Sequence, residues 1–321
     1  MSSEGPKLPF IDFSNQELKP GFPLWNSLKI QVREALEEYG CFEASYDRIP
    51  IQLRKSIFDA VTELFDLPLQ VKVKNSNGKP YHGYIGQSPL FPLYEGMGID
   101  EANVLEHAES FSKDMWPEGN SEFSKTIQNY AEQLSELDQM VRKMVLEGLG
   151  VEQYIDEHLE STHYLLRVIK YKGPQTNETK LGLPSHRDAN LVTILHQNQV
   201  QGLELQKKDG QWIDFKPSPN SFVVMIGESF HASLFNKFCS AWTNGRLHPP
   251  NHRVLMTGNE ARYSVGLFSF PKDGYMVKAP KELVDETHPL LFKPFNCPDY
   301  LAYIYKRGKK VDSSLKTYCG A

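Results

Sequence analysis

The spacing of hydrophobic residues changes character about halfway along this chain. In the first half, apolar residues three and four positions apart predict helices at residues 25–39 and 50–65. The same spacing predicts a longer helix from residue 121, after Asn120 as its capping residue. Short alternating runs at residues 8–13 and 41–44 predict two strands. The first half is therefore expected to be mainly helical.

From residue 164 the apolar runs become short, rich in β-branched and aromatic residues, and separated by turn residues. Closely spaced short strands of this kind are typical of a barrel or a sandwich. The whole is expected to be an α+β fold with an all-β core and a helix near residues 299–305. The predicted strands cover residues 165–171, 192–195, 202–205, 212–215, 221–226, 253–257 and 264–270.

Residues 75–98 are rich in Gly, Pro and Tyr and are predicted to form a long irregular loop. Loops of this length are more often functional than structural. Tyr81 and Tyr94 in this segment are therefore candidates for contacts with an organic substrate, and simple space filling is the alternative.

Composition narrows the class of protein. The chain has 321 residues with 40% hydrophobic content, enough for a large packed core. A net charge of −5 without a long Lys/Arg run disfavours nucleic acid or an anionic membrane as partner. No apolar run approaches the ~18 residues of a membrane span, and the first residues lack a signal-peptide core. Four scattered cysteines indicate reduced thiols in a cytoplasmic protein. A monomer is the default expectation, because the sequence shows no interface signal.

Two histidines and an aspartate in the β-rich half are candidate metal ligands. His186 and Asp188 are separated by one residue, so on an extended strand both side chains point the same way. His252 opens a later β-rich run and is the expected third ligand. Two imidazoles and one carboxylate with open positions opposite favour non-haem Fe(II) and dioxygen chemistry. Zinc-dependent hydrolysis is the competing interpretation of the same donors.

Three other histidines are weaker candidates for the metal. His248 lies in a Pro-rich turn and is expected to face solvent. His196 and His231 are expected to be ordinary hydrogen-bonded imidazoles.

Arg262 and Ser264 lie two residues apart and are expected on one face of a strand. A guanidinium and a hydroxyl in that arrangement can hold the carboxylate of a cosubstrate such as a 2-oxoacid. Tyr171, on an earlier strand, is a candidate for a further hydrogen bond. A surface ion pair with Glu260 is the alternative interpretation of Arg262.

Several phrases distributed over nearly the whole chain are distinctive. They include LEEYGCFEA from residue 36, PLYEGMGID from 92, YLLR from 164, WTNGR from 242, ARYS from 261 and PLLFKP from 289. With the candidate ligands, they make the chain similar to the plant 2-oxoglutarate-dependent dioxygenases. The resemblance is strongest to the branch named for alkenyl- and hydroxyalkyl-producing glucosinolate enzymes.

The resemblance implies a double-stranded β-helix (jelly-roll) core after a helical N-terminal region. We expect an N-terminal region at residues 1–120, a supporting helix at 121–160, the catalytic core at 161–275 and an extension at 276–321. The resemblance also implies Fe(II), 2-oxoglutarate and ascorbate as the reductant. The implied reaction is hydroxylation, desaturation or dealkylation of a small plant specialised metabolite, with succinate and CO2 formed from 2-oxoglutarate.

The resemblance also assigns roles to individual residues. It implies that His186, Asp188 and His252 bind iron. It implies that Arg262, Ser264 and Tyr171 bind 2-oxoglutarate, and that Phe268 and Phe270 face the organic substrate.

One segment departs from the family pattern. Residues 227–232 and 242–246 match a continuous family phrase, but residues 233–241 (SLFNKFCSA) separate the two halves. We interpret SLFNKFCSA as an insertion. It either loops out, at a modest entropic cost, or shifts a strand register and moves His252 away from the metal. The second version predicts a catalytically impaired jelly-roll binding protein.

Overall fold

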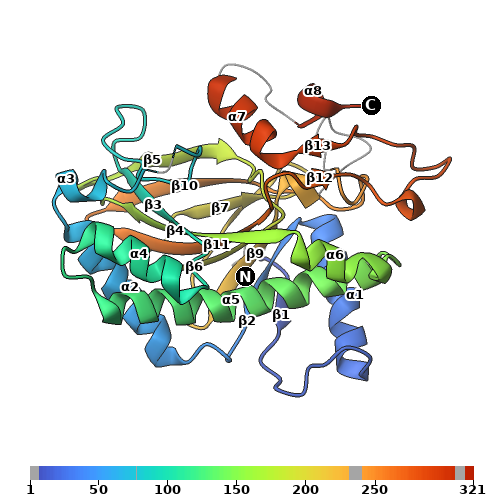
Figure 1. Cartoon of the computed structure of the whole chain (residues 1–321), viewed down its shortest axis with the longest axis horizontal. Coiled ribbons are helices and arrows are strands. Elements are labelled where there is room, and N and C mark those ends of the chain that lie inside the picture. Colours follow the sequence, from blue (N-terminus) through green and yellow to red (C-terminus); the bar gives the residue numbers. More distant parts are fainter. Residues whose placement is uncertain (1–6, 77, 231–240, 308–314) are drawn as a thin grey trace, which may run out of the picture.

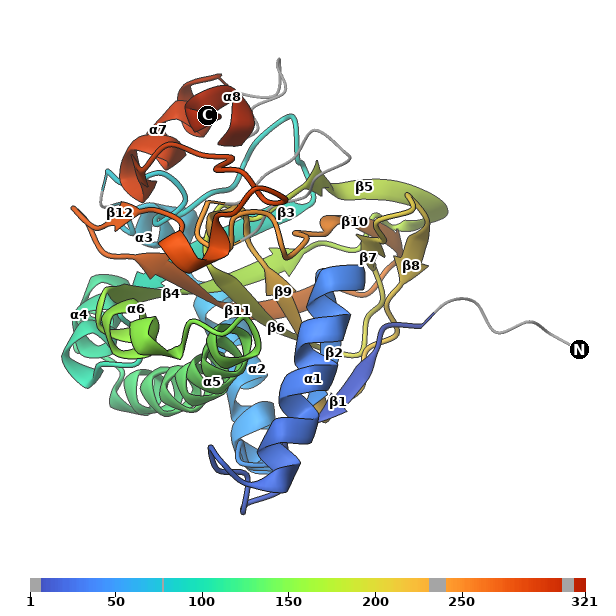
Figure 2. The ribbon, with the colours of Figure 1, turned by 90° about the vertical axis from the view of Figure 1, so that its right-hand side faces the viewer.

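The computed structural model describes residues 7–76, 78–230, 241–307 and 315–321. Two β-sheets form the centre of the protein, with helices of the first half of the chain on the outer side of the larger sheet (Figure 1). This is the expected α+β arrangement with a jelly-roll core. The C-terminal helices lie at the opposite side of the sheets from the long helix of the N-terminal half, as Figure 2 also shows.

The larger sheet contains seven strands and the smaller sheet four. Neighbouring strands are antiparallel except for the first two along the chain, which are parallel. The larger sheet has the order β1 (Phe10–Asp12), β2 (Cys41–Ser45), β9 (Ser221–Ile226), β6 (Val192–Gln197), β11 (Arg262–Pro271), β4 (Thr162–Tyr171) and β3 (Tyr94–Asp100). The smaller sheet has the order β5 (Thr176–His186), β10 (Asn251–Gly258), β7 (Leu203–Gln206) and β8 (Trp212–Asp214). A separate pair joins β12 (Met276–Val277) to β13 (Phe295–Asn296).

The helices follow the predicted apolar spacing. The side chain of Asn120 accepts a hydrogen bond from the Phe123 N–H at 3.0 Å, which confirms Asn120 as the predicted cap of the long helix. The described α-helices are α1 (Pro23–Glu38), α2 (Ile51–Asp66), α3 (Leu69–Lys72), α4 (Leu105–Met115), α5 (Ser121–Gly148), α6 (Ile155–Glu160), α7 (Cys297–Arg307) and α8 (Leu315–Cys319). Within the described ranges, none of these helices combines the length and the apolar character that crossing a membrane requires.

Side chains along β4 and β11 alternate between two environments, as expected for a strand. Leu166 and Leu267 point outward and join the large core built with α5. Tyr171 points the other way and packs with Val254 and Met256 of the smaller sheet. The face of the larger sheet that carries Tyr171 therefore lies between the two sheets.

The secondary structure predicted from the sequence was incomplete, and the extent predicted for one loop was wrong. Helix α4 and strand β5 were not anticipated. The loop predicted for residues 75–98 ends earlier than expected, because Tyr94 begins strand β3, which pairs with β4 along its whole length. Its glycines look like loop residues in the sequence, but they allow close packing: a Cβ on Gly98 would lie 2.2 Å from the His82 carbonyl oxygen.

Gly40 shows why the turn between α1 and β2 requires glycine. Its φ is +72°, and a Cβ there would lie 1.6 Å from the carbonyl oxygen of His248. The predicted helix stop is therefore also a contact point that holds the segment before β10 against the N-terminal region.

Candidate active site

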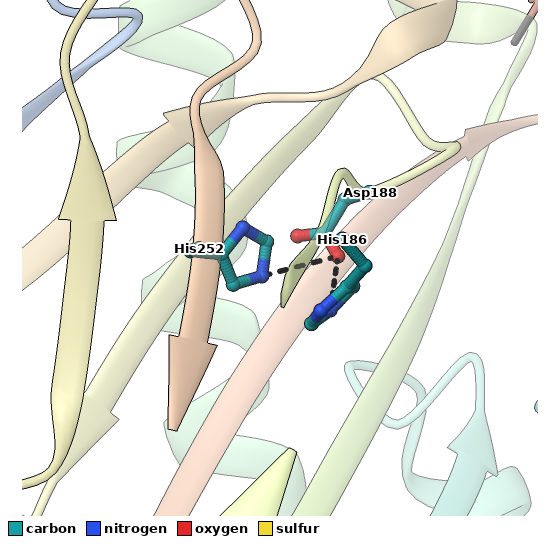
Figure 3. Close-up of side chains that lie close together, drawn as sticks. All are labelled: His186, Asp188 and His252. Atoms are coloured by element: carbon teal, nitrogen blue, oxygen red, sulfur yellow. Dashed lines mark ion pairs between the residues drawn. The ribbon is translucent and has the colours of Figure 1, made fainter. Parts of the chain in front are cut away.

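Three candidate ligands converge between the two sheets. His186 is the last residue of β5, Asp188 follows it, and His252 lies near the start of β10, where it pairs directly with His186. The Asp188 Oδ1 atom is 3.6 Å from the Nε2 atom of each histidine. Figure 3 shows the three side chains pointing toward a common centre. One donor atom from each residue lies within 4.8 Å of the others, so the tertiary structure brings His252 to two candidate ligands that lie 64 and 66 positions earlier in the sequence.

The backbone sets the tautomer of both histidines. The His186 Nδ1 atom is 2.9 Å from the carbonyl oxygen of Pro184, and the His252 Nδ1 atom is 3.4 Å from that of Pro250. A carbonyl oxygen only accepts hydrogen bonds, so Nδ1 carries the proton in each ring. Each Nε2 therefore presents its lone pair toward Asp188, as a metal ligand requires.

The carboxylate is oriented by its own partners. Thr193 of β6 donates a hydrogen bond from Oγ1 to Asp188 Oδ2 at 2.7 Å, which leaves Oδ1 directed at the histidines. The Glu228 N–H donates to the Asp188 carbonyl oxygen at 2.7 Å. The expectation that His186 and Asp188 share one strand was wrong, because β5 ends at His186 and these two contacts place Asp188 in the following loop.

The donor set fits a divalent ion such as Fe(II). Two donors at ~2.1 Å from one ion and at right angles are about 3 Å apart, so the observed 3.6 Å separations require only a small closing movement. Burial and the neighbouring His186 lower the pKa of His252 to about 4, so its imidazole is neutral and able to coordinate. Two neutral imidazoles and one carboxylate leave an open face on the ion.

Arg262 is completely buried on the inner face of β11, directly opposite Tyr171 of β4. Its Nη2 atom donates to the side-chain oxygen of Gln197 at 2.7 Å, while its Nε atom has no hydrogen-bond partner among the described residues. No ion pair joins Arg262 to a carboxylate in the described part of the chain, so the alternative pairing with Glu260 is not present. Burial lowers the pKa of the guanidinium and raises that of the Tyr171 hydroxyl.

The remaining members of the predicted anchor lie beside Arg262. The Tyr171 ring is 5.3 Å from the guanidinium carbon. Ser264 is buried on the same face, one alternation along β11, opposite Ile169 and Gln197. A buried cation with unused hydrogen-bonding capacity, beside two hydroxyl groups, suits the carboxylate of a small organic acid.

Comparison with known proteins identifies the kind of site. Residues 162–271 match the model of the 2OG-Fe(II) oxygenase superfamily, and residues 8–118 match that of the non-haem dioxygenase in morphine synthesis N-terminal region. The chain is 49% identical over 319 residues to the probable 2-oxoglutarate-dependent dioxygenase AOP1.2 of Arabidopsis thaliana, covering 97% of this chain and 95% of that protein. The chain belongs to the 2OG-Fe(II) oxygenase superfamily.

Two solved structures support the same assignment. The dioxygenase for auxin oxidation from rice superposes with a TM-score of 0.80 at 28% identity, over 98% of this dioxygenase and 100% of that chain. The 2-oxoglutarate complex of the Arabidopsis thaliana dioxygenase for auxin oxidation 1 has a TM-score of 0.76 at 25% identity, over 88% and 99%. The protein is a 2-oxoglutarate-dependent dioxygenase with a jelly-roll core, as the sequence resemblance implied.

Of the other candidate histidines, the two that the structure describes do not join the metal group. In the dioxygenase, His196 is buried and its Nδ1 atom is 2.6 Å from the Tyr130 hydroxyl oxygen, which confirms it as a hydrogen-bonded imidazole. His248 was expected to face solvent, but it is half-buried against Gly40, and burial lowers its pKa to about 4. His231 lies outside the described residues.

The candidate substrate residues lie along the same inner face. Phe268 and Phe270 of β11 pack with Leu165, and Phe270 also lines a cavity of about 80 Å³ with His82 and His163. Tyr94 is buried against the Tyr171 ring, with 5.5 Å between ring centroids.

Tyr81 is 40% exposed and lies in the loop before β3. Its ring makes an edge contact with Tyr305 of α7, with 5.9 Å between centroids. The loop before β3 and the C-terminal helix α7 therefore meet at this point.

Sequence reasoning missed Thr193, Gln197 and Arg167. The first two resemble ordinary strand residues, and only the sheet pairing shows that they support Asp188 and Arg262. Arg167 did leave a signal, because it is the one charged residue in the apolar run LLRVI and has the same strand parity as Tyr171.

Proposed function

We propose that His186, Asp188 and His252 bind Fe(II), and that Arg262, with Ser264 and Tyr171, binds the distal carboxylate of 2-oxoglutarate. The observation that carries the proposal is the convergence of the three donors on one centre, while a buried guanidinium with an unused Nε donor lies on the inner face of the larger sheet. Bound Fe(II) and 2-oxoglutarate would supply an oxygen-derived oxidant, with succinate and CO2 as coproducts.

The surrounding residues have supporting tasks in this proposal. Thr193 holds one carboxylate oxygen of Asp188 so that the other faces the ion. Gln197 holds the guanidinium of Arg262 in position, and burial removes the water that would compete for it. A charge-assisted pair formed in such a dry site is stronger than the same pair at the surface.

We propose a small plant specialised metabolite as the organic substrate, with Phe268, Phe270, Tyr81 and Tyr94 as contacts. The names of the curated relatives support a plant dioxygenase activity. Whether hydroxylation, desaturation or dealkylation follows depends on which substrate C–H bond lies nearest the open face of the ion. Ascorbate as reductant, a monomeric state and a cytoplasmic location complete the proposal.

The test is succinate formation from 2-oxoglutarate by the Fe(II)-loaded protein in air, screened against a panel of plant metabolites. Asp188→Ala is the matched variant without the metal carboxylate. Oxygen-dependent succinate formation that Asp188→Ala abolishes supports the proposal. Turnover under nitrogen with zinc would indicate a hydrolase. A wild-type protein that binds the panel but forms no succinate, even without substrate, would indicate a silent binding protein.

A further inference from the structure

Arg167 is a second buried arginine on the inner face of the larger sheet. It lies on β4 with the same parity as Tyr171, and only 6% of its surface is exposed. Its neighbours across the sheet are Gly98 on β3 and Gly266 on β11. Neither flanking residue carries a side chain, and the Arg167 Nη2 atom lies beside Gly96, 3.0 Å from the position that a Cβ on that glycine would take.

The hydrogen bonds of Arg167 are incomplete. Its Nη2 atom donates to the Tyr94 hydroxyl oxygen at 3.0 Å, whereas its Nη1 atom is buried and has no partner among the described residues. No ion pair joins it to a carboxylate in the described ranges. A buried donor without a partner, especially a charged one, is destabilising, so a protein retains it for a reason other than stability.

The other buried arginines show what a structural role looks like in this protein. Arg142 donates to Asp138, Thr162 and Tyr164 through its three nitrogens, at 2.8, 2.8 and 3.0 Å. Arg54 likewise uses all three nitrogens. Among the buried arginines of the described chain, only Arg167 and Arg262 leave a nitrogen without a partner. Arg167 therefore shares the property that marks Arg262 as an anion site.

The position of Arg167 relates it to the metal ligands. Thr193, which holds Asp188, pairs with Phe268 of β11, and Phe268 pairs with Leu165, two residues from Arg167. Two strand spacings and two residues place the backbones of Arg167 and Thr193 about 12 Å apart. A molecule held at Arg167 by one end would extend along the Phe268 ring, which covers Gly266, toward the open face of the ion.

We propose that Arg167, with the Tyr94 hydroxyl, binds an oxyanion of the organic substrate, so that the enzyme acts on an organic acid. A carboxylate is the best match, because a guanidinium presents two parallel donors to it. A sulfate ester has the same oxyanion chemistry and is distinguished in the test. This inference rests on the proposed function.

The experiment compares plant carboxylic acids and sulfate esters with their uncharged methyl esters and alcohols, using succinate formation by the Fe(II)-loaded enzyme. Accepted compounds are expected to be acids, with kcat/KM at least about 30-fold above that of the uncharged counterpart. Equal turnover of acid and ester overturns the inference. Preference for sulfate esters over carboxylates would assign the same site to a sulfated substrate.

Arg167→Met is the decisive variant, and Lys170→Gln is its control, because Lys170 is a cation on the same strand whose side chain packs over Tyr263 on the outer face. Arg167→Met should lose the preference for the acid and keep the KM for 2-oxoglutarate, whereas Lys170→Gln should keep both. The melting temperature of Arg167→Met should equal or exceed that of the wild type, because this variant removes an incompletely paired buried charge.

The outcomes separate the two levels of the proposal. A large fall in melting temperature of Arg167→Met, or an unchanged preference for the acid, would show that Arg167 is structural and would overturn the inference alone. Failure of the wild-type protein to bind 2-oxoglutarate would instead overturn the proposed function.

Discussion

Replacing Arg262 by glutamine tests the cosubstrate site most directly. The change removes the buried charge and keeps a side chain able to hydrogen-bond with Gln197, which now contacts Nη2 at 2.7 Å. The Nε atom has no partner among the described residues, so the distal carboxylate of 2-oxoglutarate would complete the hydrogen bonds of the guanidinium. Arg262→Gln should therefore weaken cosubstrate binding specifically.

The expected magnitude follows from burial. Arg262 is 1% exposed, so the pair with the carboxylate forms away from water. Removing one partner of a buried, hydrogen-bonded charge pair costs about 2–5 kcal/mol. This corresponds to a rise of about 30- to 5,000-fold in the KM for 2-oxoglutarate. The value of kcat at saturating cosubstrate should fall much less, because the three metal ligands are unchanged.

The assay is succinate formation as a function of 2-oxoglutarate concentration, repeated with 2-oxovalerate, which lacks the distal carboxylate. Wild type should strongly prefer 2-oxoglutarate, and Arg262→Gln should lose that preference. Tyr263→Phe is the control, because Tyr263 is the next residue along β11 and packs on the outer face with Phe65. An unchanged KM for 2-oxoglutarate in Arg262→Gln, or an equal loss with both oxoacids, would refute the assignment.

Three further predictions concern the metal, the insertion and pH. Thr193→Val removes the hydrogen bond to Asp188 and should weaken Fe(II) binding about 10- to 100-fold. Titration of the protein with Fe(II) in the presence of 2-oxoglutarate measures this affinity. An unchanged affinity would show that Thr193 does not orient the carboxylate. Deleting residues 233–241 should leave turnover and melting temperature unchanged, because the centroids of the flanking Phe230 and Trp242 rings already lie 5.8 Å apart and His252 pairs with His186. A gain of activity on deletion would support the version in which the insertion shifts a strand register. Burial lowers the pKa of His196 to about 3, so below pH 6.5 the unfolded chain binds a proton at this residue and the folded protein does not. The free energy of unfolding should therefore fall by about 1.4 kcal/mol per pH unit below pH 6.5 from this residue alone. Urea unfolding at pH 7.5 and 5.5 should show a smaller decrease for His196→Gln than for wild type, and equal decreases would contradict the prediction.

Local patterns in the sequence were sufficient for much of the fold. The apolar spacing predicted α1, α2 and α5, and the short runs after residue 164 predicted most strands of the two sheets. Two-residue spacing also placed Arg262 and Ser264 on one strand face. These features depend on residues close together in the chain, whose relative directions are set by helix and strand geometry.

Glycine-rich segments were harder to interpret. Gly96 and Gly98 suggested a loop, although β3 is held by pairing with β4 along its whole length. The same residues occur in loops and in strands where another backbone approaches closely, so composition alone could not separate the two cases.

By itself, the sequence determined which groups are available to this protein: two imidazoles and a carboxylate as candidate metal ligands, an arginine and a serine as candidates for holding an organic acid, and short apolar runs typical of a barrel or sandwich. Only the tertiary structure decided how those groups meet. Pairing of β5 with β10 brought His252 to His186, and the order β6-β11-β4 placed Thr193, Arg262 and Arg167 on one enclosed face. The physical reason is that strand geometry sets the direction of a side chain locally, whereas its partners come from distant strands through sheet pairing and burial.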